Sequence, residues 1–136
     1  MIVVDASLVA KLVLKEDGWE EVLGLLRREE AVTVDHALKE VLNAVWKACR
    51  LRRLISRREA EEKLAVLEKL VGGVIVVEDE SRYLREAFRL ALETGLTVYD
   101  ALYVAQAAAK AAPLATSDAR QARLAREAGV EAILVP

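Results

Sequence analysis

The sequence is poor in cysteine and histidine, since its 136 residues include only one of each, Cys49 and His36. A single cysteine cannot form a disulfide within the chain, and it excludes a zinc site built from several cysteines. Proteins of oxidising compartments often depend on disulfides, so this scarcity favours a cytoplasmic protein.

Long apolar segments are absent as well. The longest apolar stretch, residues 101–115, is interrupted by Gln106, Lys110 and Pro113, whereas a membrane-spanning helix needs roughly 18 or more apolar residues with few charges. The N-terminal apolar run contains Asp5 and follows no basic residues, so it does not resemble a signal peptide. We therefore expect neither a membrane span nor a secretion signal.

Neither sign of charge dominates the chain, which has 20 Lys and Arg against 22 Asp and Glu and a formal net charge of −2. It has no overall attraction for a polyanion, so any nucleic-acid binding must rely on local groups. With 54% hydrophobic residues, a chain of this length can bury one substantial core. We expect a single domain over residues 1–136.

Short runs of β-branched and other apolar residues recur along the sequence. They cover residues 2–4, 31–34, 74–77 and 132–135, with a weaker run at 113–116. Because apolar and polar residues do not alternate in the first four runs, these runs are predicted to be strands buried on both faces.

The segments between these runs have the spacing of amphipathic helices. Apolar residues recur every three or four positions in residues 19–26, 38–45, 60–67 and 84–91, as expected for a helix with one buried face. Alternating strands and helices predict an α/β fold, a three-layer α/β/α sandwich around a mostly parallel sheet of about five strands.

Four acidic residues stand out by their position relative to these elements. Asp5 directly follows the first predicted strand, and Asp118 follows the run at 113–116. Glu40 lies near the start of the helix after the second strand, and Asp100 near the start of the helix that precedes the run at 113–116. The carboxyl ends of parallel strands share one edge, where sites usually form. We expect the four acids to gather there.

Each acid also has a purely structural interpretation. Three of them fit helix-capping patterns: Asp5 alone, Asp100 with Thr97, and Asp118 with Gln121. Glu40 shares a polar stripe with Asn43, and such stripes usually face solvent. Taken singly, none of the four residues indicates a catalytic site.

The coincidence of four acids at one edge favours a metal site. Acids held close together raise one another's pKa values, and a divalent cation removes that repulsion. Carboxylate oxygens suit Mg²⁺ or Mn²⁺. Such an ion can lower the pKa of a bound water, polarise a phosphoryl oxygen and orient an in-line displacement.

Four segments resemble the signature segments of PIN-domain nucleases, specifically the VapC-type ribonuclease toxins. They are "MIVVDASLVAKLVL", "ALKEVLNAVWK", "LTVYDALYVAQA" and "LATSDARQARLA". The resemblance runs in order from Ile2 to Val135. The stretch "TVDHALKE" departs mildly from the family pattern near Asp35 and His36, on the approach to Glu40.

The resemblance implies a PIN fold and Mg²⁺- or Mn²⁺-dependent cleavage of single-stranded RNA. The implied catalytic and metal-binding residues are Asp5, Glu40, Asp100 and Asp118. The resemblance further implies a homodimer and, for toxins, a small antitoxin protein that plugs the site.

Several neighbouring residues are candidates for contacts with substrate. The resemblance adds a hydroxyl from Thr116 or Ser117 beside the acids, and Asn43 extends the polar stripe from Glu40. Arg120 and Arg123 follow Asp118 closely, so we expect them to meet an RNA phosphate.

Three other features allow two interpretations each. His36 lies four residues before Glu40, a spacing that fits a shared metal, but no second histidine and no nearby cysteine supports it. The five arginines of residues 50–58 fit either an RNA phosphate clamp or a solvated helix end. Tyr99 and Tyr103 fit base stacking, although a role in the core or in a dimer is favoured.

Rival functions are less consistent with the sequence. A haloacid-dehalogenase-like phosphatase needs a second acid where this chain has Ser7, and a receiver domain needs a lysine that "AILVP" lacks. A PIN nuclease of RNA maturation or quality control without a toxin role remains open, as does a non-catalytic PIN-like RNA-binding module. The chain length favours the compact toxin type, and the four acids favour catalysis.

Overall fold

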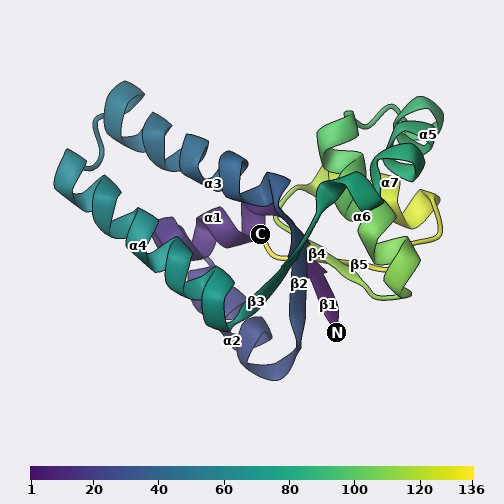
Figure 1. Cartoon of the computed structure of the whole chain (residues 1–136), viewed down its shortest axis with the longest axis horizontal. Coiled ribbons are helices and arrows are strands. Elements are labelled where there is room, and N and C mark those ends of the chain that lie inside the picture. Colours follow the sequence, from purple (N-terminus) through teal and green to yellow (C-terminus); the bar gives the residue numbers. More distant parts are fainter.

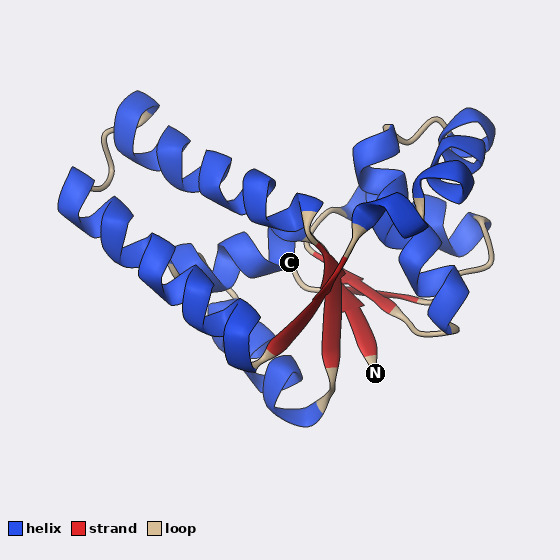
Figure 2. Cartoon of the chain, viewed as in Figure 1, coloured by secondary structure: helices blue, strands red, loops and turns tan.

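The centre of the molecule is a five-stranded parallel sheet, in a computed structural model that describes residues 1–136 (Figure 2). Its strands are β1 (Ile2–Val4), β2 (Ala31–Val34), β3 (Ile75–Glu78), β4 (Leu114–Thr116) and β5 (Ala132–Leu134). They lie in the order β3-β2-β1-β4-β5, and every neighbouring pair is parallel. All five carboxyl ends therefore meet at one edge, as the sequence predicts.

Helices cover both faces of this sheet, which confirms the predicted three-layer arrangement (Figure 1). The helices are α1 (Ala6–Leu14), α2 (Trp19–Arg28), α3 (His36–Trp46), α4 (Arg57–Gly73), α5 (Leu84–Thr94), α6 (Val98–Lys110) and α7 (Ala119–Glu127). A π-helical turn, Lys47–Leu51, extends α3, and a 3₁₀ turn, Glu80–Arg82, precedes α5. Helices α1 to α4 lie on one side and α5 to α7 on the other. No helix is both long and apolar enough to span a membrane.

The two edge strands differ from the prediction that the apolar runs are buried on both faces. The inner strands β1 and β2 are fully buried, but Val76 of β3 is 52% exposed. Strand β3 ends the sheet, and its backbone pairs only with β2. Strand β5, at the other edge, is also only partly buried. The prediction of complete burial is therefore wrong for the edges.

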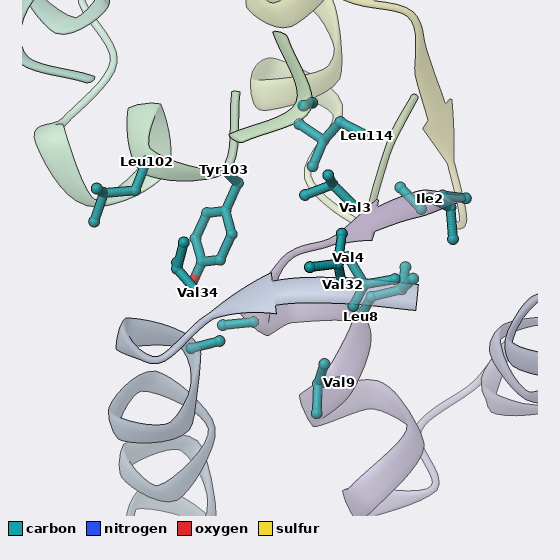
Figure 3. Packing of buried hydrophobic residues seen from close by; sticks show 14 of the residues in the cluster. Ile2, Val3, Val4, Leu8, Val9, Val32, Val34, Leu102, Tyr103 and Leu114 are labelled. Carbon is teal, nitrogen blue, oxygen red and sulfur yellow. The ribbon is translucent and has the colours of Figure 1, made fainter. Parts of the chain in front are cut away.

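Helix α6 packs against the centre of the sheet and brings its first turn to the carboxyl edge. Its small side chains, Ala101 and Ala105, are fully buried and allow close approach to the strands. Tyr103 is the largest fully buried side chain, and its ring reaches from α6 toward Val34 of β2 (Figure 3). For Tyr103, the predicted place in the core is confirmed.

Candidate active site

Four acids from four separate elements line one cavity of about 250 Å³ at the carboxyl edge of the sheet. Asp5 follows β1, Glu40 is on α3, Asp100 is on α6, and Asp118 follows β4. We name this the acidic cavity; its polar lining is Asp5, Ser7, Glu40, Asp100, Tyr103, Asp118 and Gln121. The topology brings together the four residues that the sequence singles out.

Asp5 is the innermost of these acids, with only 3% of the residue exposed. Its Oδ1 accepts hydrogen bonds from Ser7 Oγ at 2.6 Å and from the Leu8 backbone N–H at 3.1 Å. Its Oδ2 accepts one from Thr116 Oγ1 at 2.5 Å. The bond from Leu8 makes Asp5 the N-cap of α1, so Asp5 caps a helix and also lines the cavity.

The burial of Asp5 has an electrostatic consequence. Loss of hydration is the largest effect, and it raises the pKa of Asp5 to about 6, from an ordinary value of 3.8. The three hydrogen bonds act in the opposite direction, whereas the negative charge of Glu40 adds to the effect of burial. The protein therefore holds this carboxylate in an unfavourable environment.

Glu40 is directed into the site by two neighbours. Its Oε1 accepts a hydrogen bond from Tyr103 Oη at 2.7 Å and lies 3.2 Å from His36 Nε2. Partial burial is the main cause that raises the pKa of Glu40; Tyr103 and His36 lower it, and the charge of Asp100 raises it. The Glu40 side chain is 35% exposed and is held by Tyr103 of α6, so it faces solvent only in part, whereas Asn43 of the same stripe is exposed.

Asp100 and Asp118 complete the acidic lining. Thr97 is the N-cap of α6 and accepts a hydrogen bond from the Asp100 backbone N–H at 3.2 Å. Asp118 caps α7, since its Oδ1 accepts from the N–H groups of Arg120 and Gln121 at 2.9 and 3.1 Å. Burial raises the pKa of Asp100, and the negative charge of Asp118 raises it further. Asp118, like Asp5, thus caps a helix and also lines the acidic cavity.

The chemistry of these donors fits a divalent cation that retains several water ligands. In their present arrangement no three acids converge tightly enough to enclose an ion with protein ligands alone. However, Glu40 Oε2 and Asp118 Oδ2 accept no hydrogen bond within the protein, because only the other oxygen of each carboxylate is engaged. Mg²⁺ typically takes one or two carboxylates and keeps its remaining ligands as water. Unrelieved repulsion among the acids also favours a bound cation.

Two residues of the site are not among the sequence predictions. Ser7 Oγ donates to Asp5 and accepts the Ser117 backbone N–H at 3.0 Å, which ties the end of β1 to the end of β4. Gln121 is buried, and its Nε2 donates to the Asp100 carbonyl at 3.1 Å. In the sequence, the only indication that Ser7 belongs to the site is its position two residues after Asp5, in "DAS" at residues 5–7.

The two predicted hydroxyl groups, those of Thr116 and Ser117, are buried beneath the acids and do not line the acidic cavity. Thr116 is completely buried, and its hydroxyl is engaged by Asp5. It therefore positions Asp5 and is not available to contact a substrate. The Ser117 Oγ is buried and has no hydrogen-bond partner.

The three other predicted substrate contacts, Asn43, Arg120 and Arg123, lie at different distances from the acidic cavity. Asn43 is exposed and lines a second cavity with Glu40. Arg120 stays near the site, with Nη2 donating to the Gly95 carbonyl at 3.2 Å, and its charge lowers the pKa of Asp100. Arg123 instead pairs with Glu127 at 3.3 Å on the exposed side of α7. Arg123 does not line the acidic cavity, and its expected contact with an RNA phosphate stays a prediction.

Two cavities flank the acidic cavity and share Glu40 with it. The basic-side cavity, about 450 Å³, includes Asn43, Lys47 and Arg52, together with the carboxylates Glu16 and Glu40. The aromatic-side cavity, about 460 Å³, is lined by His36, Glu40, Thr97, Tyr99 and Asp100. Of the arginines in residues 50–58, Arg52 thus reaches the neighbourhood of the acids.

Comparison with known proteins agrees with this geometry. The PIN domain family model matches residues 2–127. Ribonuclease VapC3 of Pyrobaculum aerophilum is 38% identical over 118 residues, which cover 86% of this chain and 88% of that protein. Exonuclease VapC9 of the same organism is 33% identical over 115 residues, covering 85% of this chain and 78% of the relative.

A solved structure shows the same architecture. The crystal structure of PAE2754 from Pyrobaculum aerophilum superposes with a TM-score of 0.72 at 28% identity, covering 96% of this chain and 87% of that one. The family match spans most of the chain, and it includes all four acids of the cavity. The chain therefore belongs to the PIN-domain family and, within it, to the VapC nucleases.

Proposed function

We propose that the chain is a metal-dependent endoribonuclease that cleaves single-stranded RNA, and that it acts in the cytoplasm as the toxin of a VapBC-type pair. The main supporting observation is the acidic cavity, where four carboxylates from distant segments lie together at the carboxyl edge of the sheet. Burial raises the pKa values of Asp5, Glu40 and Asp100, and the charge of a neighbouring acid raises each further. The relatives named as a ribonuclease and an exonuclease support phosphodiester hydrolysis. The active unit is a single domain over residues 1–136.

Asp5, Glu40, Asp100 and Asp118 are the residues that would hold Mg²⁺ or Mn²⁺. When bound, such an ion supplies a water of lowered pKa and a Lewis acid for the phosphoryl oxygen. The chain contributes fixed ligand positions: Ser7 and Thr116 orient Asp5, and Tyr103 orients Glu40. Because these hydrogen bonds exist before substrate binds, little reorganisation is needed at the moment of reaction.

The groups around the acids suit the backbone of a single RNA strand. Lys47 and Arg52 line the basic-side cavity, and Arg120 lies beside Asp100. These cations provide local attraction for phosphates on a chain without overall positive charge. Asn43 adds a neutral hydrogen-bonding group beside Glu40.

An exposed apolar stripe on α5 fits a second copy of this chain. Leu84, Phe88 and Leu92 are 42%, 57% and 72% exposed, and their spacing of four places them on one face of the helix. Exposed apolar patches of this kind often mark protein interfaces. Two copies related by a twofold axis would bury the stripe against itself, which gives the expected homodimer.

The groove between α3 and α4 fits an antitoxin segment. It has a volume of about 770 Å³ and an apolar lining that includes Leu42, Trp46 and Leu64. Arg50, Arg53 and Arg57 also line it. An amphipathic helix with acidic residues beside its apolar face would match both features.

The direct test is cleavage of a labelled single-stranded oligoribonucleotide by the purified protein. We expect internal cleavage with Mn²⁺ or Mg²⁺, no cleavage in EDTA, and poor activity on duplex DNA. Products released one nucleotide at a time from an end would replace the endonuclease assignment by an exonuclease. Cleavage that persists in EDTA would overturn the metal mechanism.

A further inference from the structure

An exposed aromatic ring stands beside the acidic cavity. The rings of His36 and Tyr99 are stacked, with centroids 4.9 Å apart and planes inclined by 13°. Tyr99 covers His36, whose side chain is only 12% exposed, while Tyr99 itself is 60% exposed. One face of the tyrosine ring is thus supported by protein, and most of the ring remains open to solvent.

The position of Tyr99 relates it to the chemistry. It immediately precedes Asp100, and both residues line the aromatic-side cavity together with Glu40. Glu40 also lines the acidic and basic-side cavities. Glu40 therefore borders all three cavities, with Tyr99 lining the aromatic-side cavity and the cations Lys47 and Arg52 lining the basic-side cavity.

The two tyrosines of this segment have separate roles. Tyr103 is buried and its hydroxyl is engaged by Glu40, so its ring cannot meet a substrate. Tyr99 lies one helical turn earlier, at the end of α6 that reaches beyond the sheet. The preference for a core or dimer role thus holds for the core position of Tyr103, whereas the exposed Tyr99 lies outside the core and is free for either a dimer contact or a stacked base.

We propose that the ring of Tyr99, supported by His36, is a stacking platform for the base of a nucleotide adjacent to the cleaved phosphodiester. This inference rests on the proposed RNA substrate. Every base can stack on an aromatic ring. The platform therefore requires a base at this position but does not discriminate between the four bases. It also explains a single-strand preference, because a base paired in a duplex is not free to stack on the ring.

The test uses one single-stranded oligoribonucleotide whose cleaved bond has been mapped with the wild-type protein and Mn²⁺. Abasic ribose is then introduced at each position on both sides of that bond. We expect one such position to raise KM roughly 10-fold, in line with the loss of one stacked base, while kcat changes little.

Variants at the same position separate the aromatic plane from apolar bulk. Tyr99→Phe retains the ring and should leave KM unchanged, whereas Tyr99→Leu and Tyr99→Ala should raise KM roughly 10-fold. For these two variants the abasic substitution should have no additional effect. Unchanged melting temperatures and unchanged sedimentation would show that neither folding nor association explains the result.

A binding readout separates this inference from the proposed function. In EDTA, 2-aminopurine at the identified position, or at each position in turn if no cleavage is found, should lose fluorescence on binding to the wild type but not to Tyr99→Leu. Wild-type protein that shows this quenching without cleaving RNA would refute the nuclease function and retain the platform. Equal KM and equal quenching for Tyr99→Leu and wild type would overturn the platform and leave the nuclease intact. An altered oligomeric state of Tyr99→Leu with unchanged KM would likewise overturn it, in favour of a dimer contact.

Discussion

Replacement of Asp5 by asparagine should stabilise the metal-free protein. The carboxylate is 3% exposed and its pKa is raised from 3.8 to about 6, with burial as the largest cause. A difference of about two pKa units between the folded and unfolded states corresponds to about 3 kcal/mol. Ionisation of Asp5 lowers the free energy of unfolding by this amount. Asp5→Asn carries no charge at this position, so its free energy of unfolding is not lowered in this way.

The hydrogen bonds around Asp5 can accommodate the amide. Oδ1 still accepts from Ser7 and from the Leu8 N–H. The new amide nitrogen faces Thr116 Oγ1, which then accepts a hydrogen bond and can donate to Gln121 Oε1, 3.3 Å away. The pKa of about 6 already includes the hydrogen bonds to the charged carboxylate. The amide reverses one of these bonds and fits a site shaped for a carboxylate less well, so we expect a net stabilisation of about 1–2 kcal/mol. This corresponds to a rise in Tm of about 3–8 °C for a chain of this size.

The pH dependence gives the sign of the effect. Because the folded pKa of Asp5 lies above its unfolded value, its contribution to stability is fully present below about pH 3.8 and is lost as the pH rises to about 6. In EDTA the Tm difference between Asp5→Asn and wild type should therefore grow over this range and level off above it. At pH 4 most of this loss is absent, so the variant should melt at or slightly below the wild-type temperature.

Metal should reverse the order at neutral pH. An ion at about 100 times its Kd adds roughly 2.7 kcal/mol to a protein that binds it, and the variant, which has lost a ligand, should gain much less. The assay is a set of melting curves for both proteins in EDTA and in Mn²⁺. A variant that melts below wild type in EDTA at pH 7.5, or equal gains from Mn²⁺, would refute the reasoning.

Two other variants test residues around the acids and the proposed dimer. Tyr103→Phe removes the hydrogen bond to Glu40; it should lower the free energy of unfolding by about 1 kcal/mol and raise the Mn²⁺ concentration for half-maximal cleavage. A lower stability with an unchanged Mn²⁺ requirement would reduce Tyr103 to a structural role. Phe88→Glu places a charge in the exposed stripe of α5, and sedimentation should then show a monomer where the wild type is a dimer. Dimerisation of both proteins would remove α5 from the interface.

The sequence predicts the sheet and its acidic edge well for a physical reason. The inner strands β1, β2 and β4 are covered by helices on both faces, so their side chains are mostly apolar. They can therefore be recognised in the sequence as short apolar runs. Parallel pairing then brings Asp5 and Asp118 to the same edge whatever the order of the strands. The order itself is not visible in the sequence, and this explains why the exposure of Val76 at the edge was not predicted.

The details of the site depend on packing between distant segments. Ser7 and Thr116 meet around Asp5 only because β1 and β4 are neighbours in the sheet. The stack of Tyr99 on His36 likewise joins α6 to α3. Arg123 is close in sequence to Asp118 yet does not line the acidic cavity, because successive residues of a helix point in different directions.

Turnover of Asp100→Asn tests most directly whether the acidic cavity is a catalytic metal site or a set of helix caps. Thr97, not Asp100, supplies the cap of α6, so the variant should fold normally. Its rate of single-stranded RNA cleavage in Mn²⁺ should fall by orders of magnitude, with a melting temperature in EDTA that is no lower than that of wild type. Cleavage at the wild-type rate by the folded variant would contradict the assignment of Asp100 and, with it, the nuclease site.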